Sequence, residues 1–192
     1  MIRHFATKGN LEKRYIGRTE ESVDRIDQYA KNFFSEEVFS LVCCSPKKRC
    51  LETAQYLFPD IEKKVWEDFR ECDFGRFENL NYLDLEKDSD YQTWIASGGI
   101  LPFPEGEAVS DFKIRTMKAF EEMLDYCFSM QYEKIAMVVH GGTIMSILEA
   151  FAEEKKEYFD WNVSNGNGYM VEVSDLDRKK VNVCGILSLP LL

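Results

Sequence analysis

Short apolar segments that stop at polar or turn-forming residues constrain the fold of this chain most. Segment 37–44 (EVFSLVCC) combines β-branched residues with cysteines and ends at Ser45-Pro46. Segment 134–139 (KIAMVV) has the same character and ends at His140. Short apolar runs of this kind are typical of strands that are buried on both faces of a parallel sheet. Both segments are therefore predicted to be central strands.

Helical patterns separate the predicted strands. The longest covers residues 108–130 and carries a continuous apolar stripe, which is typical of a helix packed on a core. Strands that alternate with helices favour an α/β domain, here a three-layer α/β/α sandwich around a mostly parallel sheet. No repeat or linker divides the chain, so residues 1–192 are predicted to form a single domain. The remaining predicted elements are helices over 22–34, 46–57 and 143–152, and later strands over 168–174 and 180–188.

Composition excludes several classes of partner. A net charge of −10 argues against nucleic acid or an anionic membrane surface as the main partner. No apolar run approaches the ~20 residues that a membrane span needs, and the N-terminus lacks the order of a signal peptide. We therefore expect a cytoplasmic protein whose six cysteines are reduced thiols. A small anionic substrate is still compatible with this charge, provided that basic residues gather in one cleft.

The two histidines of the chain, His4 and His140, both follow predicted strands. Ligands of α/β sheets bind outside the carboxyl ends of the strands, so both side chains are expected at one edge. Arg3 and Arg49 are expected at the same edge, because Arg49 lies one helical turn beyond Ser45. A lone histidine at a strand end is more often a hydrogen-bonded structural residue, and lone arginines more often form surface ion pairs. The four together favour an anion site.

Five motifs along the chain resemble those of the histidine phosphatase (phosphoglycerate mutase-like) superfamily. The stretch Arg3-His4-Phe5-Ala6-Thr7 with Asn10 resembles the family signature RHGET-x-x-N, and Arg14 and Gly17 match the R-x-x-G that follows. The later motifs come in family order: Ser45 to Thr53 (SPxxRxxxT), Arg70 to Glu78 (ExxxGxxE), Pro104 to Glu107 with Arg115 (PxGES…R), and His140 to Thr143. The resemblance implies the phosphoglycerate mutase-like fold.

The resemblance also implies roles for seven residues. His4 would attack phosphorus, and Glu71 would act as general acid and then general base. Arg3, Arg49 and His140 would hold the phosphoryl oxygens, since guanidinium forks suit that geometry. No metal or other cofactor is expected, because the arginines supply the positive charge. The substrate-binding residues implied are Asn10 and Gly141. An acidic run is usually a solvated surface, and Glu71 is preferred within it because it holds the family position four residues before Gly75.

The chain departs from the family pattern at two places. Phe5-Ala6 replaces the usual Gly-Glu, so Phe5 is expected to adopt an ordinary backbone conformation and to wall the pocket. Only three residues precede His4 in the first strand. Either these suffice, or the native chain starts further upstream.

The function expected is metal-independent hydrolysis of a small phosphorylated metabolite. The compact length and the segment PEGEAVSDF resemble small phosphatases such as the α-ribazole-5′-phosphate phosphatases. A phosphoglycerate mutase is the first alternative, disfavoured because nothing between Gly75 and Pro104 is long enough to shield an intermediate from water. A non-catalytic phosphate-binding module is the second, disfavoured because every residue with a direct chemical role is present. A homodimer is left open.

Overall fold

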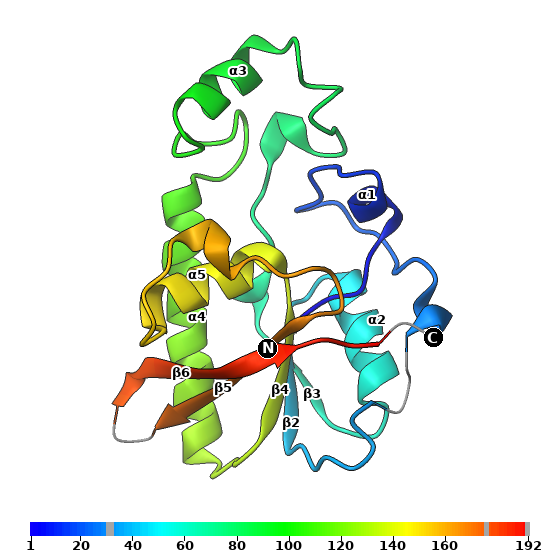
Figure 1. Ribbon diagram of the computed structural model, residues 1–192, viewed down its shortest axis with the longest axis vertical. Helices are drawn as coiled ribbons and strands as arrows, with labels where there is room; N and C mark the ends of the chain where they lie inside the picture. Colours follow the sequence, from blue (N-terminus) through cyan, green and yellow to red (C-terminus); the bar gives the residue numbers. More distant parts are fainter. Residues whose placement is uncertain (30–32, 175–176, 191–192) are drawn as a thin grey trace.

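A six-stranded sheet in the order β3-β2-β4-β1-β5-β6 forms the middle of the computed structural model (Figure 1). The structure describes residues 1–29, 33–174 and 177–190. Parallel pairing joins β3 to β2, β2 to β4 and β4 to β1, whereas β5 runs antiparallel to both β1 and β6. The strands are β1 (Ile2–Arg3), β2 (Leu41–Cys44), β3 (Lys63–Val65), β4 (Ile135–Val139), β5 (Gly168–Ser174) and β6 (Asp177–Leu187).

Side chains that alternate along β2 divide the core between the two faces of the sheet. Leu41 and Cys43 belong to the cluster formed with α4 (Val109–Ser129) and α5 (Gly141–Phe151). Val42 and Cys44 belong to the cluster formed with α2 (Lys48–Leu57). In Figure 1, α4 and α5 accordingly lie on one side of the sheet and α2 on the other. The predicted three-layer α/β/α sandwich is confirmed.

Most predicted elements have counterparts with small shifts at their ends. Strand 168–174 coincides with β5, and helices 108–130 and 143–152 correspond to α4 and α5. Strand 37–44 is shorter than predicted, because β2 begins at Leu41. Helix 46–57 begins two residues late, since Lys47 has the extended backbone of an N-cap residue (φ −68°, ψ 135°).

The predicted helix over 22–34 is wrong in its described part. Only the 3-10 turn η1 (Ile26–Gln28) forms there, and Arg25 before it has a left-handed backbone with φ 47°. Val23 instead forms an antiparallel bridge with Thr7, and its N–H donates to the Glu52 carboxylate at 2.7 Å. These contacts hold the segment extended across the N-terminal loop. Residues 30–32 lie outside the described residues.

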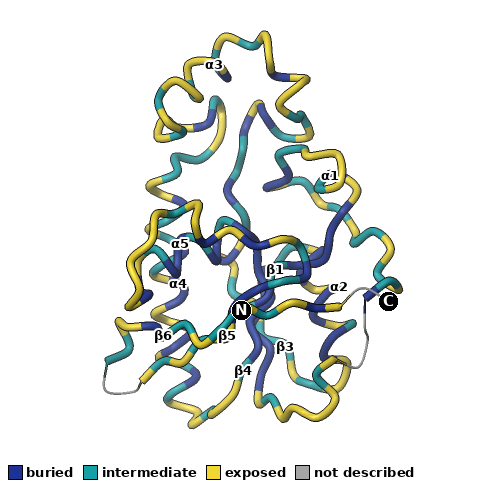
Figure 2. The backbone as a smooth tube through the Cα atoms, in the orientation of Figure 1, coloured by how far each residue is buried: buried dark blue, intermediate teal, exposed yellow. Residues whose placement is uncertain are grey.

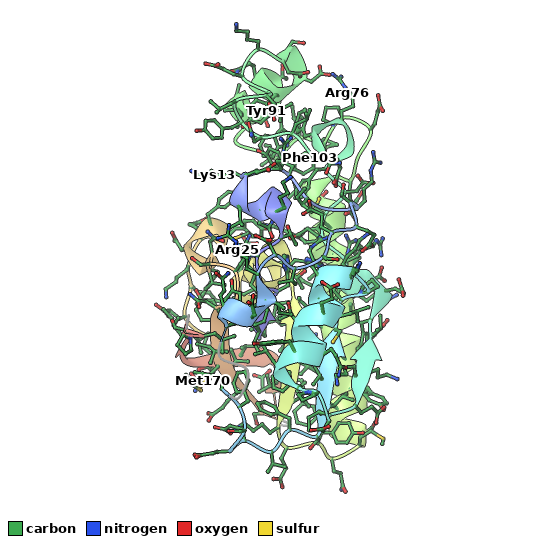
Figure 3. All side chains as sticks on the ribbon, turned by 90° about the vertical axis from the view of Figure 1, so that its right-hand side faces the viewer. Lys13, Arg25, Arg76, Tyr91, Phe103 and Met170 are labelled. Carbon is green, nitrogen blue, oxygen red and sulfur yellow. The ribbon has the colours of Figure 1, made fainter. Side chains whose placement is uncertain are left out.

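A group of short elements lies beyond the carboxyl ends of the strands, outside the three layers of the sandwich. It contains η3 (Gly75–Phe77) and α3 (Ser89–Ala96), around an aromatic cluster that includes Tyr91 and Phe103. Figure 3 shows both labelled side chains within this end of the molecule, which we call the cap (residues 75–107). The other short elements are α1 (Lys8–Leu11), η2 (Glu67–Phe69) and η4 (Tyr158–Trp161). None of the helices in the described part of the chain combines the length and apolar character needed to cross a bilayer.

Phe5 lies in the core and does not wall an open pocket, so that prediction is wrong. Its side chain is 0% exposed and stacks on Tyr29 with ring centroids 3.8 Å apart. Tyr56 packs edge-on against the same ring at 5.9 Å. The φ of Phe5 is not positive, so the bulky residue fits here without strain. The aromatic ring therefore anchors the turn that follows His4.

Replacing Phe5 with alanine should lower the free energy of unfolding by about 3–5 kcal/mol, because it leaves a cavity inside this aromatic stack. Urea unfolding followed by circular dichroism measures the change. Ile186→Ala is the matched control, since Ile186 is 67% exposed and its truncation should change stability by about 0.5 kcal/mol or less. Equal losses in the two variants would contradict the buried position of Phe5.

Candidate active site

His4 follows β1 directly and is fixed as one neutral tautomer. Its backbone N–H donates to Val139 O at 2.9 Å, which continues the ladder between β1 and β4. Its ring Nδ1 lies 2.7 Å from Phe5 O, a carbonyl that can only accept. Nδ1 therefore carries the proton, and the neutral ring has its lone pair on Nε2. Burial, followed by the charge of Arg49, holds the pKa of His4 well below 6.5.

His140 lies beside His4 because β4 and β1 are parallel neighbours. The two ring centroids are 5.1 Å apart, and the planes meet at 71°. Ser45 Oγ lies 2.7 Å from His140 Nε2, so the residue that directly follows β2 orients the second imidazole. Burial and then Arg49 hold the pKa of His140 well below 6.5 as well. At neutral pH both rings are thus uncharged.

Arg49 is a fully buried cation in the first turn of α2. Nη1 donates to Thr19 O at 2.9 Å, and Nη2 donates to Ile16 O and Gly17 O at 3.1 and 3.0 Å. Nε donates to His4 Nε2 at 3.3 Å. All four partners are neutral, so hydrogen bonds satisfy the guanidinium without cancelling its charge.

Arg3 supplies a second guanidinium from the end of β1. Its Nη1 donates to Val163 O at 2.6 Å, while its buried Nε has no hydrogen-bond partner among the described residues. Gly141, at the start of α5, lies against this guanidinium: a Cβ there would be 3.2 Å from Arg3 Cζ. The helix N-terminus, with its free backbone N–H groups, therefore lies beside the cation.

Glu71 places a carboxyl group against the same helix. Its Oε1 accepts from Cys72 N–H at 3.1 Å and lies where a Cβ on Gly142 would be only 2.5 Å away. Burial raises the pKa of Glu71, although backbone N–H groups and the charges of Arg49 and Arg3 act in the opposite direction. A raised pKa favours the protonated form, which can donate a proton.

Arg115 of α4 holds the segment that carries Glu71. It donates to the carbonyls of Asp68, Arg70 and Glu71 at 2.7–3.0 Å. A two-pronged ion pair with Glu107 at 2.7 and 2.8 Å orients its guanidinium. Arg115 is therefore a positioning residue for the carboxyl group.

Glu78 holds the loop whose carbonyls receive Arg49. Its carboxylate accepts from the backbone N–H groups of Gly17, Arg18 and Thr19 at 2.8–3.4 Å, and from the Thr19 hydroxyl at 2.7 Å. Gly17 is required there, because a Cβ would lie 1.8 Å from Cys72 O. The same short loop thus binds an anion through its N–H groups and a cation through its carbonyls.

Asn10 connects the N-terminal loop to the site. Its Oδ1 accepts from Thr7 N–H at 3.2 Å in the capping box of α1 and from Asn165 Nδ2 at 3.3 Å. Asn165 Nδ2 also donates to His4 O at 3.0 Å. Asn165 and Ser45 received no role from the sequence, since contacts with residues so distant along the chain leave no local pattern.

The arrangement suits an anion that is attacked by a neutral nucleophile. Two imidazoles and two guanidiniums face one another where β1, β2 and β4 end, and Figure 2 shows this part of the backbone as buried (dark blue). In the described part of the chain, no three His, Cys, Asp or Glu side chains form a group that could hold a metal ion. A neutral histidine whose unprotonated Nε2 lies beside the cations Arg3 and Arg49 can form a covalent bond to phosphorus.

Comparisons with known proteins show the family and the fold of the chain. The model of the histidine phosphatase superfamily (branch 1) matches residues 1–183. The α-ribazole phosphatase of Shigella flexneri has a TM-score of 0.83 at 21% identity, over 97% of this chain and 94% of that chain. Phosphoserine phosphatase of Entamoeba histolytica, solved with 3-phosphoglyceric acid, has a TM-score of 0.74 at 23% identity, over 97% and 94% of the two chains. Phosphoglycerate mutase-like protein 4 of Arabidopsis thaliana is 26% identical over 160 residues, which cover 78% of this chain and 68% of that protein.

Both histidines should resist protonation in the folded protein. Below pH 6.5 the histidines of the unfolded chain bind protons, whereas buried His4 and His140 of the folded chain stay neutral. The free energy of unfolding should therefore fall as the pH falls. The expected loss is about 1 kcal/mol per histidine between pH 7.5 and 5.5. With two histidines in the chain, two C2-proton signals in NMR report the titration directly.

The double variant His4→Gln/His140→Gln is the control and should lose this part of the pH dependence. Glu71 acts in the opposite direction: its raised pKa makes its contribution to stability full below pH 4.5 and lost as the pH rises through the folded value. The difference between the two proteins therefore isolates the histidines. A C2-proton titration near pH 6.5 would contradict their buried, cation-flanked position.

Proposed function

The chain belongs to the histidine phosphatase superfamily, and we propose that it hydrolyses small phosphomonoesters through a phosphohistidine on His4. One observation carries the proposal. The neutral His4 ring has its unprotonated nitrogen at Nε2, which accepts a hydrogen bond at 3.3 Å from the guanidinium Nε of Arg49, a cation whose hydrogen-bond partners are neutral. A neutral nucleophile beside a buried cation supports transfer of a phosphoryl dianion to His4.

In the first step, the Nε2 lone pair of His4 attacks phosphorus and the bond between phosphorus and the ester oxygen breaks. The departing oxygen takes the bond's electron pair and a proton from Glu71. The raised pKa of Glu71 supports this role, because burial favours the protonated carboxyl group, which can act as general acid. Glu71 is then a carboxylate beside the phosphohistidine.

In the second step, a water molecule attacks the phosphohistidine. Glu71 takes a proton from this water, the new P–O bond forms, and the N–P bond breaks with its electrons returning to His4 Nε2. Inorganic phosphate leaves, and both residues are back in their starting protonation states. The cycle needs no redox partner and no metal ion.

The remaining residues hold the phosphoryl oxygens. Arg3 and Arg49 contribute guanidinium N–H donors, and His140 can donate one hydrogen bond from its neutral ring. The backbone N–H of Gly141 and the side-chain amide of Asn10 bind the substrate in this proposal. Such preorganised donors stabilise the charge that spreads over the oxygens as phosphorus is transferred. The substrate class proposed is a small phosphorylated metabolite.

With EDTA present throughout, the wild-type chain should hydrolyse p-nitrophenyl phosphate, and His4→Ala should lower kcat by at least about 10⁴-fold because no covalent intermediate can form. Release of p-nitrophenolate measures turnover, and trapping with ³²P-labelled substrate detects the phosphohistidine. His4→Ala with undiminished turnover would overturn the mechanism. Transfer of the phosphoryl group to added glycerate in preference to water would favour a mutase, and phosphate binding without turnover a non-catalytic module.

Glu71→Gln should separate the two roles of the carboxyl group. With an alkyl ester such as β-glycerophosphate, kcat should fall about 10²–10⁴-fold, because the alkoxide needs a proton to leave. With p-nitrophenyl phosphate, whose leaving group needs none, a burst of one equivalent should precede slow hydrolysis of the phosphohistidine. Glu67→Gln is the matched control and should leave both rates unchanged. Equal losses with both esters and no burst would show that Glu71 has no part in proton transfer.

A further inference from the structure

Tyr158, which has no part in the proposed steps, lies beside the carboxyl group of Glu71. It belongs to η4, which lies against α5 (Figure 1). The Tyr158 hydroxyl donates to Gly142 O in the first turn of α5 at 3.4 Å. Glu71 Oε1 lies at the same residue, since a Cβ on Gly142 would be 2.5 Å from it. The phenol and the carboxyl group therefore border one residue of the helix.

The ring of Phe112, from α4, borders the same residue. A Cβ on Gly142 would be 3.1 Å from this ring, so an aromatic side chain and Glu71 Oε1 both lie against the start of α5. Phe112 is 1% exposed, whereas Tyr158 is only partly buried. Of the two rings near the carboxyl group, that of Tyr158 is therefore the one that meets solvent.

Contacts with α4 and α5 hold the ring of Tyr158 in this place. Lys113 Nζ of α4 lies 4.2 Å from the ring centroid, which is a cation–π contact. Glu149 of α5 accepts from the same ammonium group at 2.5 Å and so keeps Lys113 over the ring. Ser146 Oγ donates at 2.8 Å to Gly142 O, the carbonyl that also receives the Tyr158 hydroxyl. The ring is therefore held against both helices.

The proton on Glu71 depends on the exclusion of water. Burial raises the pKa of Glu71 and outweighs the backbone N–H groups and the charges of Arg49 and Arg3, which act in the opposite direction. Burial and then the charge of Glu71 raise the pKa of Tyr158, so the phenol stays neutral. Water at the carboxyl group would leave the effect of the two arginines dominant. Further titratable or charged groups near Glu71 are Cys50, Cys72 and the ion pair of Glu107 with Arg115.

We propose that Tyr158 is a positioning residue for proton transfer, whose ring keeps water away from the Glu71 carboxyl group and so keeps that group protonated for the first step. This role rests on the proposed function, in which Glu71 is the general acid. Tyr158 acts through Glu71 and needs no contact with the phosphoryl group. The ring excludes water and the hydroxyl only helps to hold it, so phenylalanine should replace Tyr158 and alanine should not.

The test compares Tyr158→Ala with Tyr158→Phe and Phe159→Ala. Phe159 is the next residue of η4 and is 71% exposed, so its truncation is the matched control. With β-glycerophosphate, kcat/KM should fall at high pH as Glu71 of the free enzyme loses its proton. Tyr158→Ala should move this fall to lower pH by about one pH unit or more, whereas the other two variants should leave it within about 0.3 pH units.

Hydrolysis of p-nitrophenyl phosphate separates this role from a structural one. The leaving group of this ester needs no proton, so Tyr158→Ala should change its kcat/KM by less than about threefold. Equal losses with the two esters in Tyr158→Ala would show general damage to the site and would overturn the proposal. An unchanged pH dependence with β-glycerophosphate would overturn it as well.

A titration of Glu71 without substrate distinguishes a failure here from a failure of the proposed hydrolysis. With ¹³C at the glutamate side-chain carboxyl carbons, the NMR signal of Glu71 is the one that Glu71→Gln lacks. Its titration midpoint should be lower in Tyr158→Ala than in the wild-type chain, and unchanged in Phe159→Ala. Tyr158→Asn, which brings a hydrated amide and keeps more volume, should lower it too and replaces Tyr158→Ala if that variant does not fold.

The two proposals can therefore fail separately. Equal midpoints in the wild-type chain, Tyr158→Ala and Tyr158→Asn would overturn the role of Tyr158 even if the chain hydrolyses phosphomonoesters. A lower midpoint in the Tyr158 variants of a chain without turnover would support the exclusion of water by Tyr158 and reject only the hydrolysis.

Discussion

The buried guanidinium of Arg49 is the interaction on which the site depends. A charge enclosed by protein is costly unless its hydrogen bonds are made, and here the carbonyls of the loop over 16–19 receive it. Those carbonyls are available because Glu78 binds the N–H groups of the same loop, which turns the opposite end of each peptide group toward Arg49. A cation and an anion thus share one loop, and neither cancels the other directly. The charge that reaches His4 is therefore preserved for an incoming phosphate.

The position of Glu71 depends on a second arginine, the partly buried Arg115, which also bonds to backbone carbonyls. Glu107, at the end of the cap, orients the guanidinium of Arg115 through an ion pair. Arg115 in turn donates a hydrogen bond to the backbone carbonyl of Glu71. Glu107 also accepts from Asp73 N–H at 3.4 Å. The cap and Glu71 are therefore linked through one hydrogen-bonded unit.

Sequence patterns predicted the parallel sheet, and they predicted that His4 and His140 lie close together. Both results follow from the parallel direction of the strands. His4 and His140 end parallel neighbouring strands, so no long-range packing detail was needed to bring them together. The helix over 22–34 was wrong in its described part because apolar periodicity reports burial, and here an extended segment anchored by Glu52 packs Val23 and Ile26 against the core without a helix. Phe5 was misplaced because its direction depends on Tyr29, a contact between distant residues. Hydrogen bonds from a side chain to remote backbone groups, such as those from Arg115 to the segment that carries Glu71, leave no periodic pattern in the sequence.

The contrast between the acidic surface and the cationic site bears on what the site can admit. A net charge of −10 opposes the approach of large polyanions, whose many charges meet the surface at once. A small phosphomonoester meets this field only until it reaches the buried guanidiniums, where screening by salt is weak and each hydrogen bond is preorganised. The pKa values of both histidines lie well below 6.5, so the positive charge beside the two neutral rings comes from Arg49 and Arg3, with a smaller contribution from Lys47. A buried cationic site of this kind favours a small dianion because of where its charge lies and not because of how much charge the chain carries.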